Sequence, residues 1–284
     1  MEFTTLGRTG RTVSRLGFGG APAGLTNYLD NYSPTNHDQR EQVIAAIERA
    51  VALGITYFDT APGYGSGASE AIFGEALADA GGEIFVATKI NRDEPNVRAG
   101  IEASLTRLRR DQLDLVQIHG SSYSPDLAAS ILGDGGLLAQ LETLREEGLI
   151  RHLGFTSEDN NGAVFQFIGS NRFDVMQICY NLLHQHAYEP TRPFGSLLEA
   201  DKAGMGTVTM RTLTSGLLQK WIRTVNPADE FDYTPALLQF VLSNPLVDVA
   251  LVGMRTVAEV ERNVAIANES AARIDIAALH AKYV

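Results

Sequence analysis

Four ionisable side chains follow the ends of three successive apolar runs, and together they could act on a carbonyl group. Asp59 ends one run, and Tyr64 follows it by five residues in a glycine-rich stretch. Lys89 and His119 stand at the ends of the next two runs. An ammonium beside a phenol lowers the pKa of the phenol, and a nearby carboxylate keeps the ammonium charged. The phenol could then protonate a carbonyl oxygen that the imidazole orients.

Each of these side chains also has a purely structural interpretation. An aspartate after a strand commonly caps a helix, and a lysine at a strand end commonly extends into solvent. We favour the chemical interpretation because all four residues fall at the carboxyl ends of adjacent predicted strands, where barrel enzymes hold their sites. The structural interpretation is kept for Ser69, as the cap of the following helix. It is also kept for Cys179, as a buried apolar side chain.

Eight short apolar runs, each followed by a helix-like segment, must position these side chains. Most runs are apolar on both faces, as buried parallel strands are. The segment 38–54 shows apolar residues at helical spacing and ends at Gly54. Eight such pairs in about 250 residues predict a (β/α)8 TIM barrel. A doubly wound sheet would need a phosphate-binding glycine pattern, which Pro22 interrupts. The predicted strands span residues 14–20, 55–60, 84–90, 113–119, 150–156, 173–180, 206–213 and 247–254.

Two stretches fall outside the eight units. Residues 2–13 predict a small hairpin across one end of the barrel, and residues 271–284 predict an extra C-terminal helix. No repeat or linker divides the sequence, so we expect residues 1–284 to form a single domain. The longest loops, at about 21–38 and 214–233, are expected to form walls of a pocket.

Composition limits the partners. The chain has 23 Lys and Arg against 34 Asp and Glu, a net charge of −11, which would repel nucleic acid and anionic membranes. The sequence has no apolar run of about 18 residues and no signal peptide pattern, and its one cysteine suits a reducing compartment. We therefore expect a cytoplasmic protein. His184 and His186 have no evident third ligand, so no metal is predicted. Oligomeric state is left open.

The stretch FDTAPGYGSGASEAIFGEAL resembles the signature of the aldo-keto reductase family, in which D-T-A precedes Y-G-x-G-x-S-E. The resemblance extends through FVATKI, LDLVQIH, IRHLGFTS, MQICYN and LVGMRTVAEVERNVA. It implies a barrel enzyme that reduces aldehydes or ketones with NAD(P)H, or oxidises an alcohol or sugar in reverse. By motif position, Asp59, Tyr64, Lys89 and His119 would be its catalytic tetrad, with Tyr64 as the general acid or base.

The same resemblance implies where the cofactor binds. In the family a Ser-Asn pair and a Gln hold the nicotinamide carboxamide; here Ser157, Glu158 and Gln177 match, and Glu158 cannot donate as an amide does. Arg255 is the expected partner of a 2′-phosphate, whereas Glu259 could bond ribose hydroxyls, as in NAD sites. We expect NADPH, with NADH as the alternative. The expected cofactor-binding residues are Ser157, Gln177, Met210, Arg211, Leu213, Gly216, Leu218, Gly253, Met254, Arg255, Thr256, Glu259, Arg262 and Asn263.

Two other functions stay open. Lys89 could form a Schiff base, as in an aldolase, but this needs a neutral amine, and Asp59 argues against it. A non-catalytic NADPH-binding sensor or regulatory protein would instead show tight cofactor binding with slow turnover. The small-molecule substrate is left open among sugars, small aldehydes and cyclic ketones.

Overall fold

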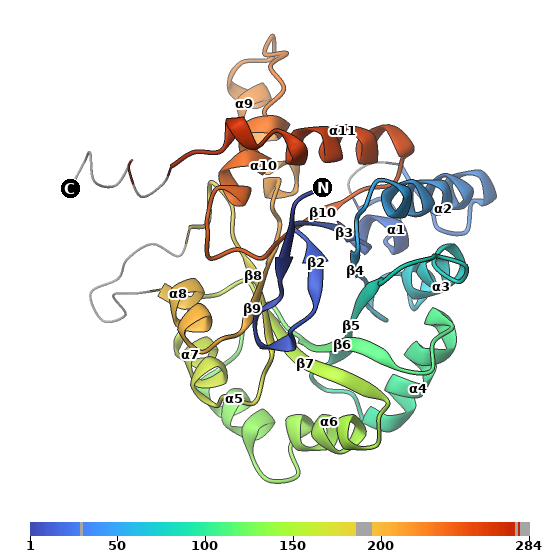
Figure 1. Ribbon diagram of the computed structural model, residues 1–284, viewed down its shortest axis with the longest axis vertical. Helices are drawn as coiled ribbons and strands as arrows, with labels where there is room; N and C mark the ends of the chain where they lie inside the picture. Colours follow the sequence, from blue (N-terminus) through green and yellow to red (C-terminus); the bar gives the residue numbers. More distant parts are fainter. Residues whose placement is uncertain (29–30, 186–194, 276–277, 279–284) are drawn as a thin grey trace.

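The computed structural model describes residues 1–28, 31–185, 195–275 and 278. In this part of the chain eight parallel strands close into a barrel with helices around it, as the sequence predicts (Figure 1). Each strand pairs with the next along the chain, and the last pairs with the first. The barrel strands are β3 (Leu16–Gly19), β4 (Tyr57–Asp59), β5 (Phe85–Asn91), β6 (Leu113–His119), β7 (Ile150–Ser157), β8 (Val175–Cys179), β9 (Gly206–Met210) and β10 (Val249–Gly253).

The helices begin and end at the residues that local chemistry favours. The side chain of Asn36 accepts a hydrogen bond from the amide of Gln39 and caps the helix that follows, and Asn96 acts in the same way on Ala99. The helices are α1 (Ala21–Gly24), α2 (His37–Ala52), α3 (Ala68–Ala76), α4 (Val97–Leu108), α5 (Pro125–Leu132), α6 (Leu137–Glu146), α7 (Gly162–Gly169), α8 (Gly195–Lys202), α9 (Leu217–Val225), α10 (Thr234–Leu242) and α11 (Val257–Asn268), with 3-10 turns η1 (Gly7–Thr9), η2 (Thr214–Gly216) and η3 (Ser270–Ala272).

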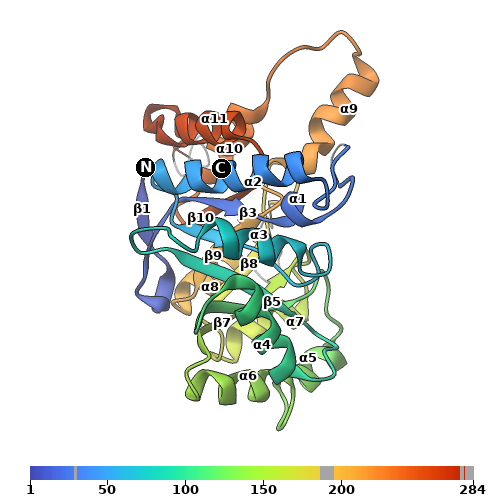
Figure 2. The same cartoon turned by 90° about the vertical axis from the view of Figure 1, so that its right-hand side faces the viewer.

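The predicted N-terminal hairpin is present and covers the amino-terminal end of the barrel. Strand β1 (Phe3–Thr5) pairs antiparallel with β2 (Thr12–Ser14). Leu6 packs among the side chains inside the barrel. Gly7 has a left-handed backbone, and a Cβ atom there would overlap the backbone of Gly206. In Figure 2 the hairpin lies on the left and α9 projects on the upper right, away from it. The predicted C-terminal helix lies mostly outside the described residues.

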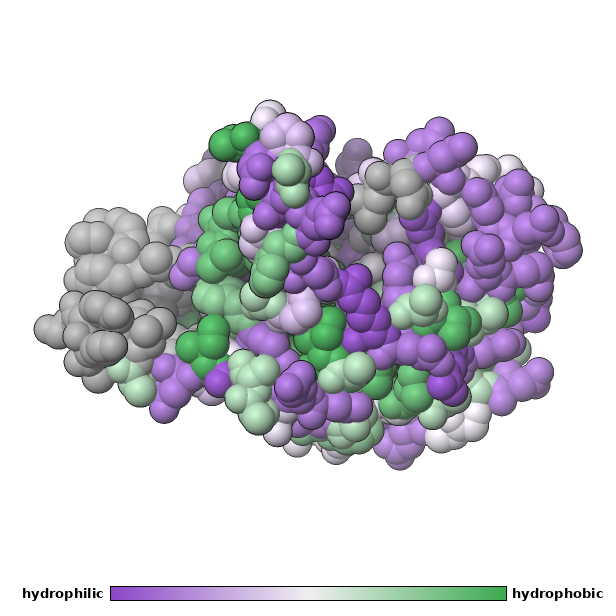
Figure 3. All heavy atoms as spheres, turned by 90° about the horizontal axis from the view of Figure 1, so that it is seen from above, coloured by the Kyte–Doolittle hydropathy of each residue, from purple (hydrophilic) through white to green (hydrophobic). Residues whose placement is uncertain are grey.

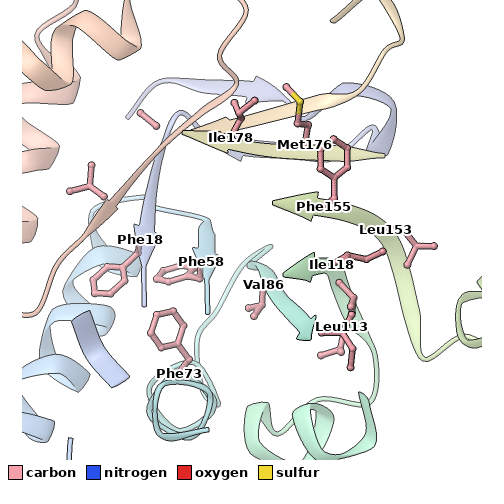
Figure 4. Packing of buried hydrophobic residues seen from close by; sticks show 14 of the residues in the cluster. Phe18, Phe58, Phe73, Val86, Leu113, Ile118, Leu153, Phe155, Met176 and Ile178 are labelled. Carbon is pink, nitrogen blue, oxygen red and sulfur yellow. The ribbon is translucent and has the colours of Figure 1, made fainter. Parts of the chain in front are cut away.

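Apolar side chains fill the space between the barrel and its helices, and a second group fills the inside of the barrel. Three aromatic rings show how this packing fixes the strands that carry the site (Figure 4). Phe18 of β3 lies 5.9 Å from Phe58 of β4 and 5.7 Å from Phe73 of α3, measured between ring centroids. Such ring pairs add to the burial of area. They hold β3, β4 and α3 in one arrangement at the end of the barrel where Asp59 lies.

The surface seen from above carries hydrophilic residues over much of its area, with apolar residues in scattered groups between them (Figure 3). Within the described ranges, no helix has the length and apolar character that a membrane crossing requires. The same residues contain no group of three or more His, Cys, Asp or Glu side chains that could hold a metal ion. His186 lies outside them, so the pair it forms with His184 in the sequence is not described.

Candidate active site

A cavity of about 430 Å³ opens at the carboxyl ends of the strands, and all four predicted catalytic residues line it. Its volume falls in the range of small-molecule sites. Tyr28, from the first predicted long loop, also lines the cavity, and so does Gln219, from the helix α9 that forms within the second predicted loop. Trp221 does not: its side chain is 51% exposed on α9. The structure therefore brings the four residues together at one end of the barrel.

Lys89 and Asp59 form a buried ion pair at the bottom of this cavity. Lys89 Nζ donates to Asp59 Oδ1 at 2.6 Å and to the carbonyl oxygen of Thr60 at 2.8 Å. Burial alone would lower the pKa of Lys89, but Asp59 and Tyr64 outweigh it and the pKa is raised. Burial raises the pKa of Asp59, and the Lys89 charge opposes this shift. We conclude that Lys89 is a fixed ammonium.

Tyr64 lies beside this ammonium. Lys89 Nζ is 5.0 Å from the centre of the Tyr64 ring. Burial raises the pKa of the Tyr64 phenol, and the Lys89 charge lowers it, as the sequence predicts. Burial outweighs the charge, so the pKa lies above its ordinary value and not below it. The phenol therefore holds its proton at neutral pH, next to a group that stabilises its anion.

The glycine-rich turn places Tyr64 by close backbone packing. A Cβ atom on Gly65 would overlap the carbonyl oxygen of Gly24, so α1 and the turn touch directly. The prediction that Ser69 caps the following helix is wrong, because Gly67 occupies the cap position. Ser69 is buried, and its hydroxyl donates to the carbonyl oxygen of Gly20 at 2.9 Å. It ties the turn to the end of β3, a contact that local sequence does not reveal.

Glu70, the second acidic residue of the signature stretch, braces the same turn from below. Its side chain is fully buried. One carboxylate oxygen accepts from the Thr88 hydroxyl at 2.5 Å, and the other accepts from Arg107 Nε at 2.6 Å. Thr88 is the neighbour of Lys89 on β5. Arg107 packs under Gly67, where a Cβ atom would lie 2.6 Å from its Cδ. Glu70 thus links the strand of Lys89 to the turn of Tyr64.

His119 forms the other side of the cavity. Its ring lies edge to face with the Tyr64 ring, with 5.8 Å between the centroids. Burial lowers the pKa of His119 to about 4, and the Lys89 charge acts in the same direction. The imidazole is therefore neutral at physiological pH. A neutral imidazole can donate one hydrogen bond without bringing a charge to the site.

Two amides form a polar layer beneath these groups. Gln117 Nε2 donates to Asp59 Oδ2 at 3.1 Å and to Gln177 Oε1 at 3.0 Å. Gln177 is a predicted cofactor residue, whereas the sequence analysis missed Gln117. The signal was available, because Gln117 stands two residues before His119 on a strand and so points to the same side.

The predicted cofactor residues divide into two groups. Seven line the cavity, namely Gln177, Met210, Arg211, Leu213, Gly216, Gly253 and Glu259. The cavity lining does not include the other seven, which are Ser157, Leu218, Met254, Arg255, Thr256, Arg262 and Asn263. Ser157 is fully buried, and its hydroxyl donates to the carbonyl oxygen of Asp159 at 3.0 Å. Arg262 forms an ion pair with Asp232.

Glu158 and Arg211 meet across the cavity wall. Arg211 Nη2 donates to Glu158 Oε1 at 2.6 Å, and both residues line the cavity. Arg211 has a left-handed backbone with φ of 55°, and Asn181 Nδ2 donates to its carbonyl oxygen at 2.9 Å. Asn181 therefore holds the backbone of Arg211 in place. The carboxylate that replaces the family amide at position 158 is neutralised by a partner 53 residues away in sequence.

The start of α11, where a 2′-phosphate is expected, is occupied by the chain's own carboxylate. Glu259 Oε2 accepts from the backbone amides of Arg255 at 2.7 Å and Thr256 at 3.0 Å. The Thr256 hydroxyl accepts from the Glu259 amide in return, which completes a capping box. Arg255 lies over the ring of Tyr32, with 4.6 Å from its Cζ to the ring centre.

Comparison with known proteins identifies relatives along most of the chain. The model of the aldo/keto reductase family matches residues 15–237. L-galactose dehydrogenase of Arabidopsis thaliana is 28% identical, covering 95% of this chain and 89% of the relative. Methylglyoxal reductase YeaE of Escherichia coli is 26% identical, covering 89% of this chain and 88% of the relative.

Solved structures show the same fold. Aldo-keto reductase AKR11C1 from Bacillus halodurans, in its holo form, superposes with a TM-score of 0.73 at 22% identity, covering 95% of this chain and 92% of that one. An aldo-keto reductase from Klebsiella pneumoniae in complex with NADPH gives a TM-score of 0.72 at 21% identity, covering 99% and 94%.

Proposed function

The chain belongs to the aldo/keto reductase family, and we propose that it transfers a hydride between a nicotinamide dinucleotide and the carbonyl carbon of a small aldehyde or ketone. The observation that carries this proposal is the contact of Lys89 with both Asp59 and Tyr64 inside one cavity. A phenol that borders a fixed ammonium is a proton donor for a carbonyl oxygen. We assign Tyr64 that role, and in the reverse direction it accepts the proton.

The lining of the cavity fits a nicotinamide cofactor. Gln177 supplies an amide that can meet a carboxamide, and Met210 offers a polarisable face on which a ring can pack. Gly216, where no atom lies within 4 Å of the position of a Cβ, lets a ligand approach the backbone closely, whereas Pro22 fills that space at Gly253. The bound cofactor supplies the hydride. NADPH, which the Klebsiella pneumoniae relative binds, is the cofactor we propose, with NADH as the alternative.

The residues of the chain act on the substrate oxygen. His119, neutral above pH 5, donates a hydrogen bond to the carbonyl oxygen and orients it. Tyr64 gives its proton to that oxygen as negative charge develops on it. Lys89 stabilises the phenolate that remains, and Asp59 keeps Lys89 charged and aimed at Tyr64. Asp59 and Lys89 are buried, which strengthens the interaction between their charges.

The same geometry argues against a Schiff-base aldolase. Such an enzyme needs a lysine that loses its proton readily. Lys89 instead holds a carboxylate oxygen at 2.6 Å, and its pKa is raised. No contact in the described residues favours a purely regulatory protein, and turnover separates that alternative from the proposal.

The test is a panel of aldehydes, ketones and sugars, followed by the absorbance of NADPH and NADH at 340 nm, with the reverse reaction run on sugars and alcohols. We expect turnover with at least one carbonyl and its loss in Tyr64→Phe. Tight NADPH binding without turnover on any member would favour the sensor alternative. Borohydride trapping of substrate on Lys89 would favour the aldolase.

A further inference from the structure

Gln117 lies in the polar layer directly beneath the proposed catalytic groups. It is fully buried on β6, where it pairs in register with Lys89 on one side and with Gly154 on the other. A Cβ atom on Gly154 would lie 3.1 Å from Gln117 Cγ. The glycine therefore leaves room for the glutamine side chain inside the barrel.

The amide of Gln117 has one orientation that its neighbours allow. Its Nε2 faces two acceptors, Asp59 Oδ2 at 3.1 Å and Gln177 Oε1 at 3.0 Å. If the amide were turned over, its oxygen would face both of those oxygens instead, without a proton between them. The ionised carboxylate of Asp59, which can only accept, therefore fixes the direction in which the Gln117 amide donates.

The other end of the amide has no partner. Gln117 Oε1 is buried and accepts no hydrogen bond from any described residue. An unpaired buried acceptor lowers stability, and an apolar side chain of the same size would avoid that loss. Stability alone therefore does not account for a glutamine at this position, whereas its donor end completes a catalytic carboxylate.

We propose that Gln117 is a positioning residue that acts through Asp59: it occupies the carboxylate oxygen that Lys89 leaves open and so keeps Asp59 an anion aimed at Lys89. This inference rests on the proposed function. Lys89 takes Oδ1 and Gln117 takes Oδ2, so both oxygens of a fully buried carboxylate have donors.

Loss of the Gln117 donor should first change the protonation of Asp59 and, through it, the charge of Lys89 and the stability of the Tyr64 phenolate. A buried carboxylate with one unpaired oxygen binds a proton more readily. A protonated Asp59 no longer holds the charge of Lys89, and the Tyr64 phenolate then loses its stabilising ammonium. The rate of proton transfer falls, although Gln117 itself is not part of the cavity lining.

The experiment compares Gln117→Met, which removes the donor at similar volume, with Gln117→Glu. A protonated glutamate can donate to Asp59 Oδ2, whereas an ionised one repels it. Leu115→Met, a buried apolar change on the same strand, controls for disturbance of the barrel interior. The kcat and KM of each variant are measured from pH 5.5 to 9, with thermal unfolding as a check on folding.

We expect Gln117→Met to lower kcat by about tenfold to a hundredfold, less than the loss of the general acid itself, with KM changed by less than about threefold. Gln117→Glu should approach the wild-type kcat at low pH and fall away as pH rises. Leu115→Met should keep the wild-type profile. A kcat of Gln117→Met within twofold of wild type overturns the proposal. A Gln117→Glu variant whose kcat has the same pH dependence as that of the wild type also overturns it.

A second measurement separates this proposal from the proposed function, because it needs no turnover. The absorbance titration of Tyr64 is obtained as the difference between each protein and its Tyr64→Phe derivative. The Tyr64 titration should move to higher pH in Gln117→Met and stay in place in Leu115→Met. An unmoved Tyr64 titration contradicts the role of Gln117, whereas absence of turnover in the wild type contradicts only the function.

Discussion

The ammonium of Lys89 lies 5.0 Å from the centre of the Tyr64 ring. Lys89 is buried and Tyr64 is partly buried, so solvent screens their interaction less than it would screen an exposed pair. Lys89 comes from a barrel strand and Tyr64 from a glycine-rich turn 25 residues earlier in the sequence. Their separation is set by the brace of Glu70 and by the contact of the turn with α1.

Tyr64→Phe should lower kcat by about 10² to 10⁴, because it removes only the hydroxyl that we propose as the proton donor. The Kd of NADPH, measured from the fluorescence of the cofactor, should stay within about twofold of wild type. Tyr233→Phe, a hydroxyl change outside the cavity lining, is the control and should keep wild-type kinetics. Turnover of Tyr64→Phe within a few fold of wild type would show that another group protonates the substrate.

His119 should stay neutral over the working range of pH. Its pKa of about 4 lies below the ordinary value of 6.5, so kcat/KM should show no loss from His119 between pH 7 and pH 5. A folded-state pKa below the unfolded value contributes stability above pH 6.5 that is lost as pH falls through 4. The free energy of unfolding should therefore fall more between pH 7 and 4.5 in wild type than in His119→Asn. An imidazole NMR titration near 6.5 would contradict this.

Gly74→Ala should destabilise the fold. The helices α3 and α4 touch at Gly74, where a Cβ atom would overlap the carbonyl oxygen of Arg107. Overpacking of this kind costs about 1–3 kcal/mol in the free energy of unfolding, which urea denaturation measures. Gly169, the last residue of α7, has no atom within 4 Å of such a Cβ, so Gly169→Ala should change stability by less than about 1 kcal/mol. Equal effects of the two substitutions would refute the packing argument.

Glu259→Gln should raise the affinity for NADPH relative to NADH. The Glu259 carboxylate lies on the α11 amides where a 2′-phosphate is expected, and like charges repel. Removing one such charge should shift the ratio of the two Kd values by on the order of tenfold, less at high salt. Glu261→Gln changes a carboxylate of the same helix that pairs with Arg49, and should leave the ratio unchanged. If neither variant changes the ratio of the Kd values for NADPH and NADH, the 2′-phosphate does not bind at the start of α11.

Much of the fold can be predicted from the sequence because its signals are local. Each barrel strand is a short apolar run buried on both faces, and all eight predicted strands overlap observed ones. The N-terminal hairpin is confirmed for the same reason. That residues 1–284 form one domain stays a prediction, and the C-terminal helix falls mostly on residues that the structure does not describe.

The site is predictable only in part, since its remaining features depend on contacts between distant residues. The four predicted catalytic positions share one rim because parallel strands end together. The prediction that Ser69 caps a helix is wrong because its hydroxyl donates to the carbonyl oxygen of Gly20, 49 residues away in sequence. The pairing of Glu158 with Arg211 depends in the same way on the closed ring of strands. The net pKa of Tyr64 depends on burial, which a sequence does not reveal for a loop residue.

The hairpin beneath the barrel has a kinetic consequence. Leu6 and the backbone of Gly7 fill the amino-terminal end, so in the described part of the chain a ligand reaches Tyr64 from the opposite rim. A dinucleotide and a carbonyl compound would then enter by the same opening, and the one that binds deeper must bind first and be released last. Product inhibition measured at steady state should accordingly show a compulsory order of substrate binding and product release.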